Sequence, residues 1–340
     1  SRLGGVRMLD LNTKKIKKNA FRITKHRGTT SLRVRIPGGE LDADIMPILH
    51  DIAKKYGDGK MHITIRQGFE ITGIRFEDMP EVNKMIEPVI QKLEVDNGVE
   101  IGEPNKGYPA AGTRNISACI GNKVCPFANY NTTQLAKRIE KEIFPHDHHF
   151  KVACTGCPND CIKAHMQDFG VIGTAKVEYD YSQCIGCEAC VKNCKIRVTG
   201  ALSMKNGKVV RDERRCVGCG ECALTCPTQA WSRNPQKYYR LVIMGRTGKK
   251  NPRIARTFLE WVDEDTIVKV IKNTYAFVDE YIDRSLPKEH VGYIVDRAGY
   301  QKFKEYALKD VILPKGAKVA EYIDFGGYKY ERDAFMIEAE

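Results

Sequence analysis

The placement of its thirteen cysteines constrains this 340-residue chain more than any other feature of the sequence. Eight of them form two runs with the spacing C-x2-C-x2-C-x3-C, which begin at Cys184 and Cys216. Two such runs close together are typical of paired [4Fe–4S] clusters, because three thiolates of one run and the last thiolate of the other complete each cluster. We therefore assign one cluster to Cys184, Cys187, Cys190 and Cys226, and the other to Cys216, Cys219, Cys222 and Cys194.

Zinc is the alternative metal, since C-x2-C pairs also bind zinc. The complete four-cysteine run, present twice, favours iron–sulfur clusters over zinc. Both runs lie within residues 180–232, so we interpret this segment as an inserted domain of the bacterial two-cluster ferredoxin type. Cys194 is followed by lysine where Cys226 is followed by proline, and this difference leaves the four ligands of each site intact.

Four more cysteines form a second constellation in loops that are rich in glycine and proline. They are Cys119 and Cys125, spaced C-x5-C, and Cys157 and Cys161, spaced C-x3-C. Four thiolates from two loops can hold a third [4Fe–4S] cluster, whereas the alternative is a set of buried structural cysteines. We interpret Cys154, just before the second pair, as a bystander in the core.

The overall composition is that of a globular protein with two or three domains. So many clustered cysteines argue against a disulfide scaffold and predict a reducing, cytoplasmic compartment. No apolar run is long enough to span a membrane, and the N-terminus has no signal-peptide pattern. The net charge is +12, but no nucleic-acid-binding motif is visible; an oxyanion or polycarboxylate ligand explains the basic excess better.

The N-terminal part of the chain predicts a ferredoxin-like α+β half-domain over residues 20–100. Residues 1–19 are interpreted as a tail, of which the first seven are a remnant or a loose end. After the tail, alternating and amphipathic patterns follow each other in the order β-α-β-β-α. The predicted strands are 31–36, 61–65 and 71–74, and the predicted helices are 41–56 and 81–93.

The rest of the chain predicts an α/β domain, formed by residues 101–179 and 233–285, that the cysteine-rich segment interrupts. Its predicted strands are 151–153, 171–179 and 239–244, and its predicted helices are 131–144, 255–261 and 266–282. Residues 286–340 form a C-terminal extension of unassigned role, with one predicted helix over 301–308.

The C-x5-C and C-x3-C pairs resemble the signature of the sirohaem sulfite and nitrite reductases. In that family the four cysteines hold a [4Fe–4S] cluster coupled to sirohaem, and the last cysteine bridges the two. The resemblance covers residues 20–285, interrupted by the insert. It implies that the interrupted domain binds sirohaem, that Cys161 is the axial thiolate, and that the chain holds three [4Fe–4S] clusters.

Several basic residues lie in further stretches that resemble this family. These stretches are RVRIPGG with Arg33 and Arg35, TIRQGFEITGI with Arg66, GTRNISAC with Arg114, HHFKVA with His149 and Lys151, and GRTGKKNPRIA with Gly245, Arg246 and Thr247. His149 replaces the first of two family lysines. The resemblance implies that Arg66, Arg114, His149 and Lys151 act on the substrate. It implies sirohaem contacts for Arg33, Arg35, Gly245, Arg246 and Thr247.

The family resemblance implies a catalytic subunit that reduces sulfite to sulfide with six electrons relayed through the insert. No Rossmann G-x-G-x-x-G motif is present, so iron–sulfur and flavin or NADH-type donor subunits are expected. A single copy of the sirohaem unit implies pairing with a second copy or with a homologous chain. The alternatives are a nitrite reductase and a non-catalytic electron-transfer subunit. His146 and His148 belong either to a metal site or to a solvated loop.

Overall fold

A computed structural model describes residues 20–102, 112–248, 251–286 and 289–325 of the chain. The predicted tail, residues 1–19, lies outside the described residues. The chain divides into two compact units. The first unit contains the residues up to Cys125 together with Asn131–Cys154, and the second contains Pro126–Tyr130 together with the residues from Thr155 onward.

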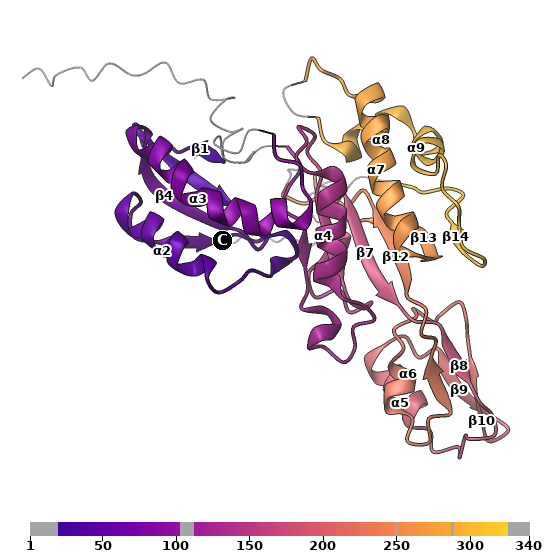
Figure 1. Ribbon diagram of the computed structural model, residues 1–340. Helices are drawn as coiled ribbons and strands as arrows, with labels where there is room; N and C mark the ends of the chain where they lie inside the picture. Colours follow the sequence, from indigo (N-terminus) through magenta and orange to yellow (C-terminus); the bar gives the residue numbers. More distant parts are fainter. Residues whose placement is uncertain (1–19, 103–111, 249–250, 287–288, 326–340) are drawn as a thin grey trace, which may run out of the picture. The chain divides into compact units, whose positions relative to one another are not determined.

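The first unit begins with a four-stranded antiparallel sheet in the order β1-β2-β4-β3 (Figure 1). Its strands are β1 (Phe21–Ile23), β2 (Thr29–Val34), β3 (Met61–Ile63) and β4 (Phe69–Arg75). The helices α2 (Ile45–Lys55) and α3 (Met79–Leu93) bury their apolar faces against this sheet, with Leu32, Leu49 and Ile86 fully buried in one core. This is the predicted ferredoxin-like order, preceded by one strand that was not predicted from the sequence.

The remainder of the first unit carries the loops in which the candidate residues lie. Helix α4 (Thr132–Ile143) begins at Asn131, whose side chain accepts a hydrogen bond from the backbone N–H of Gln134. The short strand β5 (Ser117–Ala118) pairs in parallel with β6 (Val152–Thr155). Short 3-10 turns are η1 (Pro37–Gly39), η2 (Phe76–Asp78), η3 (Val95–Asn97) and η5 (Gly121–Lys123).

The second unit is built on an antiparallel series of strands in the order β7-β12-β13-β14. These are β7 (Phe169–Thr174), β12 (Tyr238–Ile243), β13 (Arg256–Val262) and β14 (Lys318–Val319), and turn η6 (Ala164–Met166) precedes them. Helices α7 (Glu264–Tyr281), α8 (Val291–Ala298) and α9 (Tyr300–Ala307) complete the unit. Phe277 of α7 and Phe303 of α9 pack edge to face, 5.6 Å between ring centroids.

Two predictions for this region are wrong. The predicted helix 255–261 is the strand β13, because its sequence, RTFLEWV, is rich in β-branched and aromatic residues and pairs with β12. The predicted strand 171–179 divides at Ala175 into β7 and the separate strand β8 (Val177–Tyr179). Helix α8 and strand β14 were not predicted at all.

The cysteine-rich insert connects β7 to β12 within the second unit (Figure 1). Strand β8 enters the insert and β11 (Trp231–Arg233) leaves it, and the two pair antiparallel with Tyr179 opposite Trp231. Between them lie α5 (Ala189–Arg197), the hairpin of β9 (Leu202–Lys205) and β10 (Lys208–Arg211), and α6 (Glu221–Thr225). Because its two ends are paired, the insert has the arrangement expected of a separate module. Among the described residues, no helix combines the length and apolarity that a membrane span requires.

Candidate functional site

A cavity of about 160 Å³ in the first unit is lined by four arginines: Arg33, Arg35, Arg66 and Arg114. They come from three separate segments. Strand β2 supplies Arg33 and leads into Arg35, the turn between β3 and β4 supplies Arg66, and the segment before β5 supplies Arg114. Among the described residues that line the cavity, none is acidic. The fold therefore concentrates positive charge that the sequence distributes over 82 positions of the chain, from 33 to 114.

Asn115 ties the segments of this cavity together. Its side-chain amide donates to the carbonyl oxygens of Ile36, at 2.9 Å, and of Arg66, at 2.7 Å. Its side-chain oxygen accepts from the backbone N–H of Ile36 at 3.0 Å. Arg66 in turn donates from Nε to the Asn115 carbonyl at 3.2 Å and from Nη2 to the Val152 carbonyl at 3.3 Å. The cavity wall is therefore fixed by hydrogen bonds within the protein itself.

Arg35 is buried and held by two carboxylates. Its guanidinium is hydrogen-bonded to Glu140 and lies 3.5 Å from Glu94, while Nη1 donates to the Thr113 carbonyl at 2.6 Å. The ring of Phe144 lies 3.7 Å from the guanidinium carbon. Burial and the neighbouring Glu140 carboxylate raise the pKa of Glu94 well above its ordinary value. Arg35 thus anchors the backbone just before Arg114.

Arg114 lies within this excess of positive charge. Burial, followed by repulsion from Arg33, Arg22 and Arg35, lowers the pKa of Arg114 to about 10. Glu70 offsets part of this charge through a contact of 3.0 Å with Arg33. An anion in the cavity would relieve the remaining repulsion, so this region is suited to bind an oxyanion or a carboxylate.

His149 and Lys151 flank Phe150, whose carbonyl accepts a hydrogen bond of 2.9 Å from the backbone N–H of Arg114. The fold therefore brings their segment next to that of Arg114, although neither side chain lines the arginine cavity. His148 is buried, and its ring centroid lies 4.6 Å from that of His146. This burial argues against a simple solvated loop at these histidines.

The cysteines of the second constellation lie in different units, so each pair is described on its own. Cys119 follows β5 and donates its backbone N–H to the carbonyl of Cys154, at 3.0 Å, while Cys154 itself is fully buried in β6. In the second unit Cys157 is buried and Cys161 is exposed. Asp160 accepts hydrogen bonds from the backbone of Ala164, at 2.6 Å, and of His165, at 3.1 Å, and so fixes the loop between and after these cysteines.

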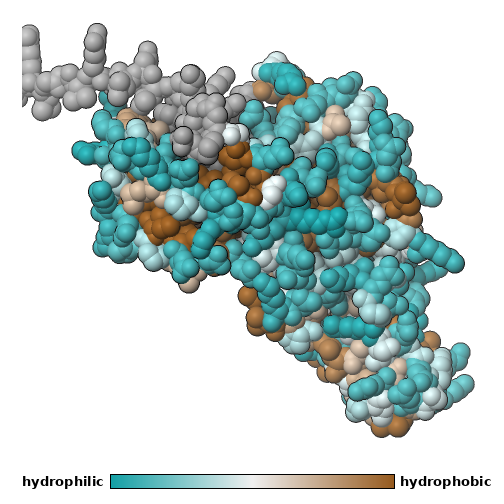
Figure 2. Space-filling view, viewed as in Figure 1, coloured by the Kyte–Doolittle hydropathy of each residue, from teal (hydrophilic) through white to brown (hydrophobic). Residues whose placement is uncertain are grey.

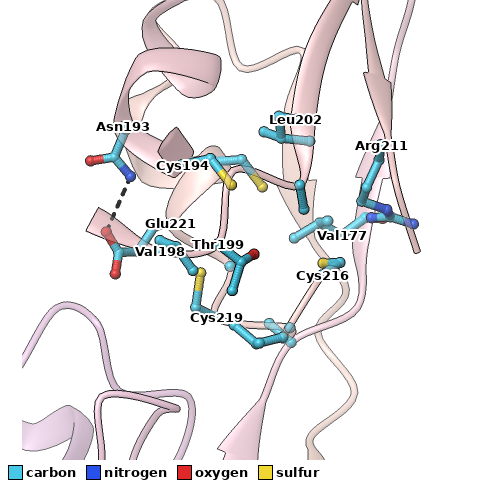
Figure 3. Close-up of a pocket in the computed structure, with 16 residues that line it drawn as sticks. Val177, Asn193, Cys194, Val198, Thr199, Leu202, Arg211, Cys216, Cys219 and Glu221 are labelled. Atoms are coloured by element: carbon cyan, nitrogen blue, oxygen red, sulfur yellow. Dashed lines mark hydrogen bonds between the residues drawn. The ribbon is translucent and has the colours of Figure 1, made fainter. Parts of the chain in front are cut away.

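The insert places four thiols around one cavity (Figure 3). Cys194 comes from α5, Cys216 and Cys219 come from the loop after β10, and Cys222 comes from α6. Burial, followed by repulsion from Cys219 and Cys216, raises the pKa of Cys222 to about 12. A bound metal would offset this cost, because coordination favours the thiolate. These four cysteines are one of the two sets that the spacing predicts.

Three cysteines of the other predicted set share an apolar cluster with Leu202, Val209 and Trp231; they are Cys184, Cys190 and Cys226. The fourth, Cys187, is exposed. The two sets are neighbours, since the Cys190 thiolate is among the charges that raise the pKa of Cys222. Both donor sets therefore suit thiolate-ligated clusters, and Cys187 is the exposed member of the eight thiols.

The segment Gly245–Thr247 is held by the C-terminal extension. Asp296 of α8 binds two buried arginines, Arg246 at 3.1 Å and Arg253 at 2.6 Å, and these arginines are bridged through their backbones. Thr247 donates its hydroxyl to the Met166 carbonyl at 3.1 Å. Asp296 was missed at the level of the sequence, because its helix was not predicted.

Comparison with known families identifies the chain. The model of the nitrite and sulphite reductase 4Fe-4S domain matches residues 110–312, and that of the nitrite/sulfite reductase ferredoxin-like half domain matches residues 23–89. The chain belongs to the nitrite and sulfite reductase family. These matches confirm the predicted ferredoxin-like half-domain and the family resemblance.

Within this family, the individual relatives favour sulfite reductases over nitrite reductases. The chain is 46% identical to a subunit of the anaerobic sulfite reductase of Salmonella typhimurium, over 90% of this chain and 91% of the relative. It is 32% identical to the coenzyme F420-dependent sulfite reductase of Methanocaldococcus jannaschii, over 82% of this chain and 42% of the relative. Several nitrite reductases are more distant and match less than half of the chain. The crystal structure of dissimilatory sulfite reductase I has a similar fold, with a TM-score of 0.62 at 17% identity, covering 89% of this chain and 76% of that one.

Proposed function

We propose that this chain is the catalytic subunit of a sulfite reductase and that it reduces sulfite to sulfide with six electrons. The observation that carries the proposal is the cavity of four arginines, in which burial and repulsion lower the pKa of Arg114. Sulfite is a small oxyanion, and the planar guanidinium matches its oxygens well. The close relationship to the anaerobic sulfite reductase of Salmonella supports sulfite over nitrite.

The cofactors of the proposal are sirohaem and a [4Fe–4S] cluster that Cys119, Cys125, Cys157 and Cys161 would hold, and the Cys161 thiolate would also serve the sirohaem. When bound, sirohaem supplies the metal centre at which sulfite takes up electrons. The donor chemistry fits, because sirohaem carries many carboxylates and the described chain offers buried arginines. Arg33 and Thr247, with the backbone at Gly245, would hold those carboxylates, while Arg35 and Arg246, which are paired with Glu140 and Asp296, would fix the segments that carry them.

The substrate residues of the proposal are Arg66, Arg114, His149 and Lys151. Arg66 and Arg114 would bind the sulfite oxygens and stabilise the negative charge that grows on them as S–O bonds break. Lys151 and His149 would complete the basic surroundings and hold protons near the departing oxygens. The rigid wall around Asn115 keeps the arginine side chains in position for this task.

The insert is proposed to hold two [4Fe–4S] clusters that relay electrons one at a time. Iron–sulfur and flavin or NADH-type subunits would supply the electrons, in agreement with the Salmonella relative being one of several subunits of its enzyme. A single copy of the sirohaem unit leads us to propose, in addition, that the chain pairs with itself or with a homologous chain.

The absorption spectrum of the anaerobically purified chain tests the proposal. Sirohaem gives strong visible bands that iron–sulfur clusters lack, so these bands should accompany sulfite turnover with reduced methyl viologen. Turnover of nitrite measured in parallel should be the slower of the two. Clusters without sirohaem bands would instead identify a non-catalytic electron-transfer subunit, and faster turnover of nitrite would reverse the substrate assignment.

A further inference from the structure

The two cysteine sets of the insert differ in the side chains that surround their sulfur atoms. We infer that Trp231 and Tyr179 donate hydrogen bonds to sulfur atoms at the first set and so raise the reduction potential of its cluster above that of the cluster at the second set. The inference rests on the proposed function, since it assumes that both sets hold [4Fe–4S] clusters. It goes further by naming residues that set the potential of one of them. The first set is Cys184, Cys187, Cys190 and Cys226, and the second set is Cys194, Cys216, Cys219 and Cys222.

Trp231 has a buried N–H group without an ordinary acceptor. It lies on β11 and is 4% exposed, and its indole nitrogen makes no hydrogen bond within the described part of the chain. A buried tryptophan normally pairs this group, so an acceptor of another kind is expected. Trp231 shares an apolar cluster with Cys190. Burial raises the pKa of Cys190, and the Trp231 side chain opposes this rise, as a donor to the sulfur would.

The pairing of β8 with β11 fixes the indole in this position. Tyr179 lies opposite Trp231 in the register, and the two rings stack with their centroids 4.5 Å apart. The guanidinium carbon of Arg211 lies 5.7 Å from the centre of the indole, where its charge is attracted to the ring. The same strand pair therefore presents both Trp231 and Tyr179 to the first set.

Two hydroxyl groups act on further sulfur atoms of the first set. The Tyr179 hydroxyl accepts a hydrogen bond of 3.1 Å from the backbone N–H of Val209, so its own hydrogen is available to Cys184. Its hydrogen bond is the largest influence on Cys184 and lowers the pKa of that thiol. The Thr228 hydroxyl lies 3.7 Å from the Cys226 sulfur. Since a metal-bound thiolate carries no proton, this hydroxyl would be the donor.

The polar side chains at the second set donate to oxygen instead. Asn193, Thr199 and Arg211 line the cavity around which its thiols lie. Asn193 donates to the Glu221 carboxylate at 3.1 Å (Figure 3). Thr199 donates to the carbonyl of Arg215 at 2.6 Å, and Arg211 donates to a carboxylate at 2.7 Å and to a carbonyl at 3.2 Å. These side chains therefore direct their hydrogens away from sulfur.

The charges near the first set offset one another. Lys208 donates to the carbonyl of Cys184 at 2.7 Å and brings a positive charge to this set. The exposed carboxylates of Asp180 and Glu188 oppose it, and Lys192 lies 3.8 Å from Glu188. Water and salt screen these exposed groups. The side-chain donors therefore remain as the feature that distinguishes the first set.

Solvent acts in the same direction as the donors. Cys187 is exposed, and Ile185, two positions earlier, is 68% exposed. Apolar surface of the insert is visible in Figure 2. Water near a cluster favours its more negative, reduced form, as hydrogen bonds to sulfur do. A substitution at the buried Trp231 leaves the exposure of Cys187 unchanged and so isolates the contribution of the hydrogen bond.

The direction of the effect follows from charge. Reduction adds one electron, and so one negative charge, to a cluster that its four thiolates already make negative. A hydrogen donated to sulfur stabilises this charge more in the reduced than in the oxidised form. Removal of a donor should therefore lower the potential. Loss of packing alone would admit water and shift the potential the other way, so the sign separates a tuning role from a structural one.

Trp231→Phe tests the inference, because it removes the N–H and keeps an aromatic ring. The matched control is Trp261→Phe, since Trp261 meets the loop of the second set through ring carbons. A Cβ atom on Gly218 would lie 2.8 Å from its Cη2. Potentials are measured on the full-length, anaerobically purified chain by redox titration followed by electron paramagnetic resonance. Cys187→Ser identifies the signal of the first set, since it alters a ligand of that cluster alone.

At a fixed applied potential, Trp231→Phe should lower the ratio of reduced to oxidised cluster at the first set about tenfold, which is about 59 mV for a one-electron couple. The ratio at the second set should change by less than about twofold, and Trp261→Phe should change either ratio by less than about twofold. Tyr179→Phe removes one hydroxyl from a partly exposed ring and should lower the first ratio about threefold. This variant gives the answer if Trp231→Phe loses iron.

An unchanged or raised potential at the first set, in variants that keep the wild-type iron content, would overturn the inference. So would an equal shift in Trp261→Phe, a wild type in which the second set has the higher potential, or an insert without clusters. The titration needs neither sulfite nor sirohaem. Its failure is therefore distinguishable from failure of the proposed function, which the absorption spectrum and sulfite turnover decide.

Discussion

The arginine cavity and the cysteine insert both hold ionisable groups against their electrostatic preference, but they achieve this in different ways. In the cavity, like charges are crowded and buried, and Arg114 has a pKa lowered to about 10. Hydrogen bonds made by Asn115, and those that Arg35 donates to the Glu140 carboxylate, fix the surrounding segments. In the insert, burial opposes the thiolate form of Cys222, and the thiols come from helices α5 and α6 and from the loop after β10.

This difference shows which region depends on its ligand for structure. The cavity has its own scaffold of internal hydrogen bonds, so it should keep its shape whether or not an anion is bound. In the insert, Asn193 of α5 donates a hydrogen bond to Glu221 of α6 at 3.1 Å, and a cluster would add metal–thiolate bonds between the same segments, so that metal binding is also folding free energy.

The largest effect is expected at Cys161. Cys161→Ser should abolish sulfite turnover with any donor and uncouple sirohaem from its cluster, because it removes the thiolate that we propose serves both cofactors. Cys154→Ser is the matched control, since that thiol is fully buried in β6 and falls outside the C-x3-C pair. Electron paramagnetic resonance of both variants checks the coupling. Loss of the cluster in Cys154→Ser, with retention in Cys161→Ser, would contradict the ligand assignment.

Deletion of residues 180–232, bridged by a short glycine–serine linker, should abolish turnover driven by a protein donor. The remaining chain should still bind sirohaem and reduce sulfite with methyl viologen, because β7 and β12, which lie on either side of the deleted segment, pair directly with each other. Sirohaem content and turnover with both donors are the measurements. A folded deletion variant without sirohaem would show that the insert is part of the cofactor site.

The contrast also explains what the sequence could reveal. The cysteine sets could be predicted from the sequence because metal ligands follow fixed spacings within a short segment. The structure places Cys194 around one cavity with Cys216, Cys219 and Cys222, which is the grouping that the repeat suggested. Amphipathic helices such as α3 and α7 were predicted within two residues at each end.

Features that depend on tertiary packing could not be predicted from the sequence. Arg33 and Arg114 are far apart in the sequence, and nothing in it indicates that Asn115 connects their segments. Residues 255–261 were predicted as a helix, and only the pairing with β12 decides for a strand. Asp296 was also missed, because its helix was not predicted and because the arginines it binds lie more than 40 positions away in the chain.

A smaller effect is expected for Arg114→Gln, which should lower activity but raise the stability of the protein. Loss of one guanidinium from the cavity should reduce sulfite turnover by about 10²- to 10³-fold. The same change should stabilise the protein at neutral pH. Because the pKa of Arg114 is lowered from 12.5 to about 10 in the folded chain, the charged form opposes folding at every pH below about 10, and this penalty fades as the pH rises toward 12.5.

The shift corresponds to an upper limit of about 3–4 kcal/mol, at 1.36 kcal/mol per pKa unit. Thermal unfolding and steady-state kinetics at pH 7 check both parts of the prediction. The control is Arg75→Gln, because Arg75 is exposed and pairs with Asp78 away from the cavity. If Arg114→Gln lowered both stability and turnover, the guanidinium would be a structural element and not a charge held ready for an anion.

The smallest effect is expected at Asp296, which gives the segment Gly245–Thr247 the kind of internal scaffold found in the arginine cavity. Asp296→Asn should leave Arg246 and Arg253 close together without a counter-charge. Removing one partner of a buried ion pair costs about 3–5 kcal/mol, but Asp296 is partly exposed and asparagine keeps a hydrogen bond, so we expect about 1–2 kcal/mol. Sirohaem per chain, measured from the absorption spectrum, should fall severalfold, because the segment proposed to hold its carboxylates loosens.

Asp310→Asn is the control, since Asp310 is an exposed residue in a left-handed conformation that asparagine also accepts. Unchanged sirohaem content in a destabilised Asp296→Asn variant would separate the C-terminal extension from the cofactor site and leave it a purely structural role.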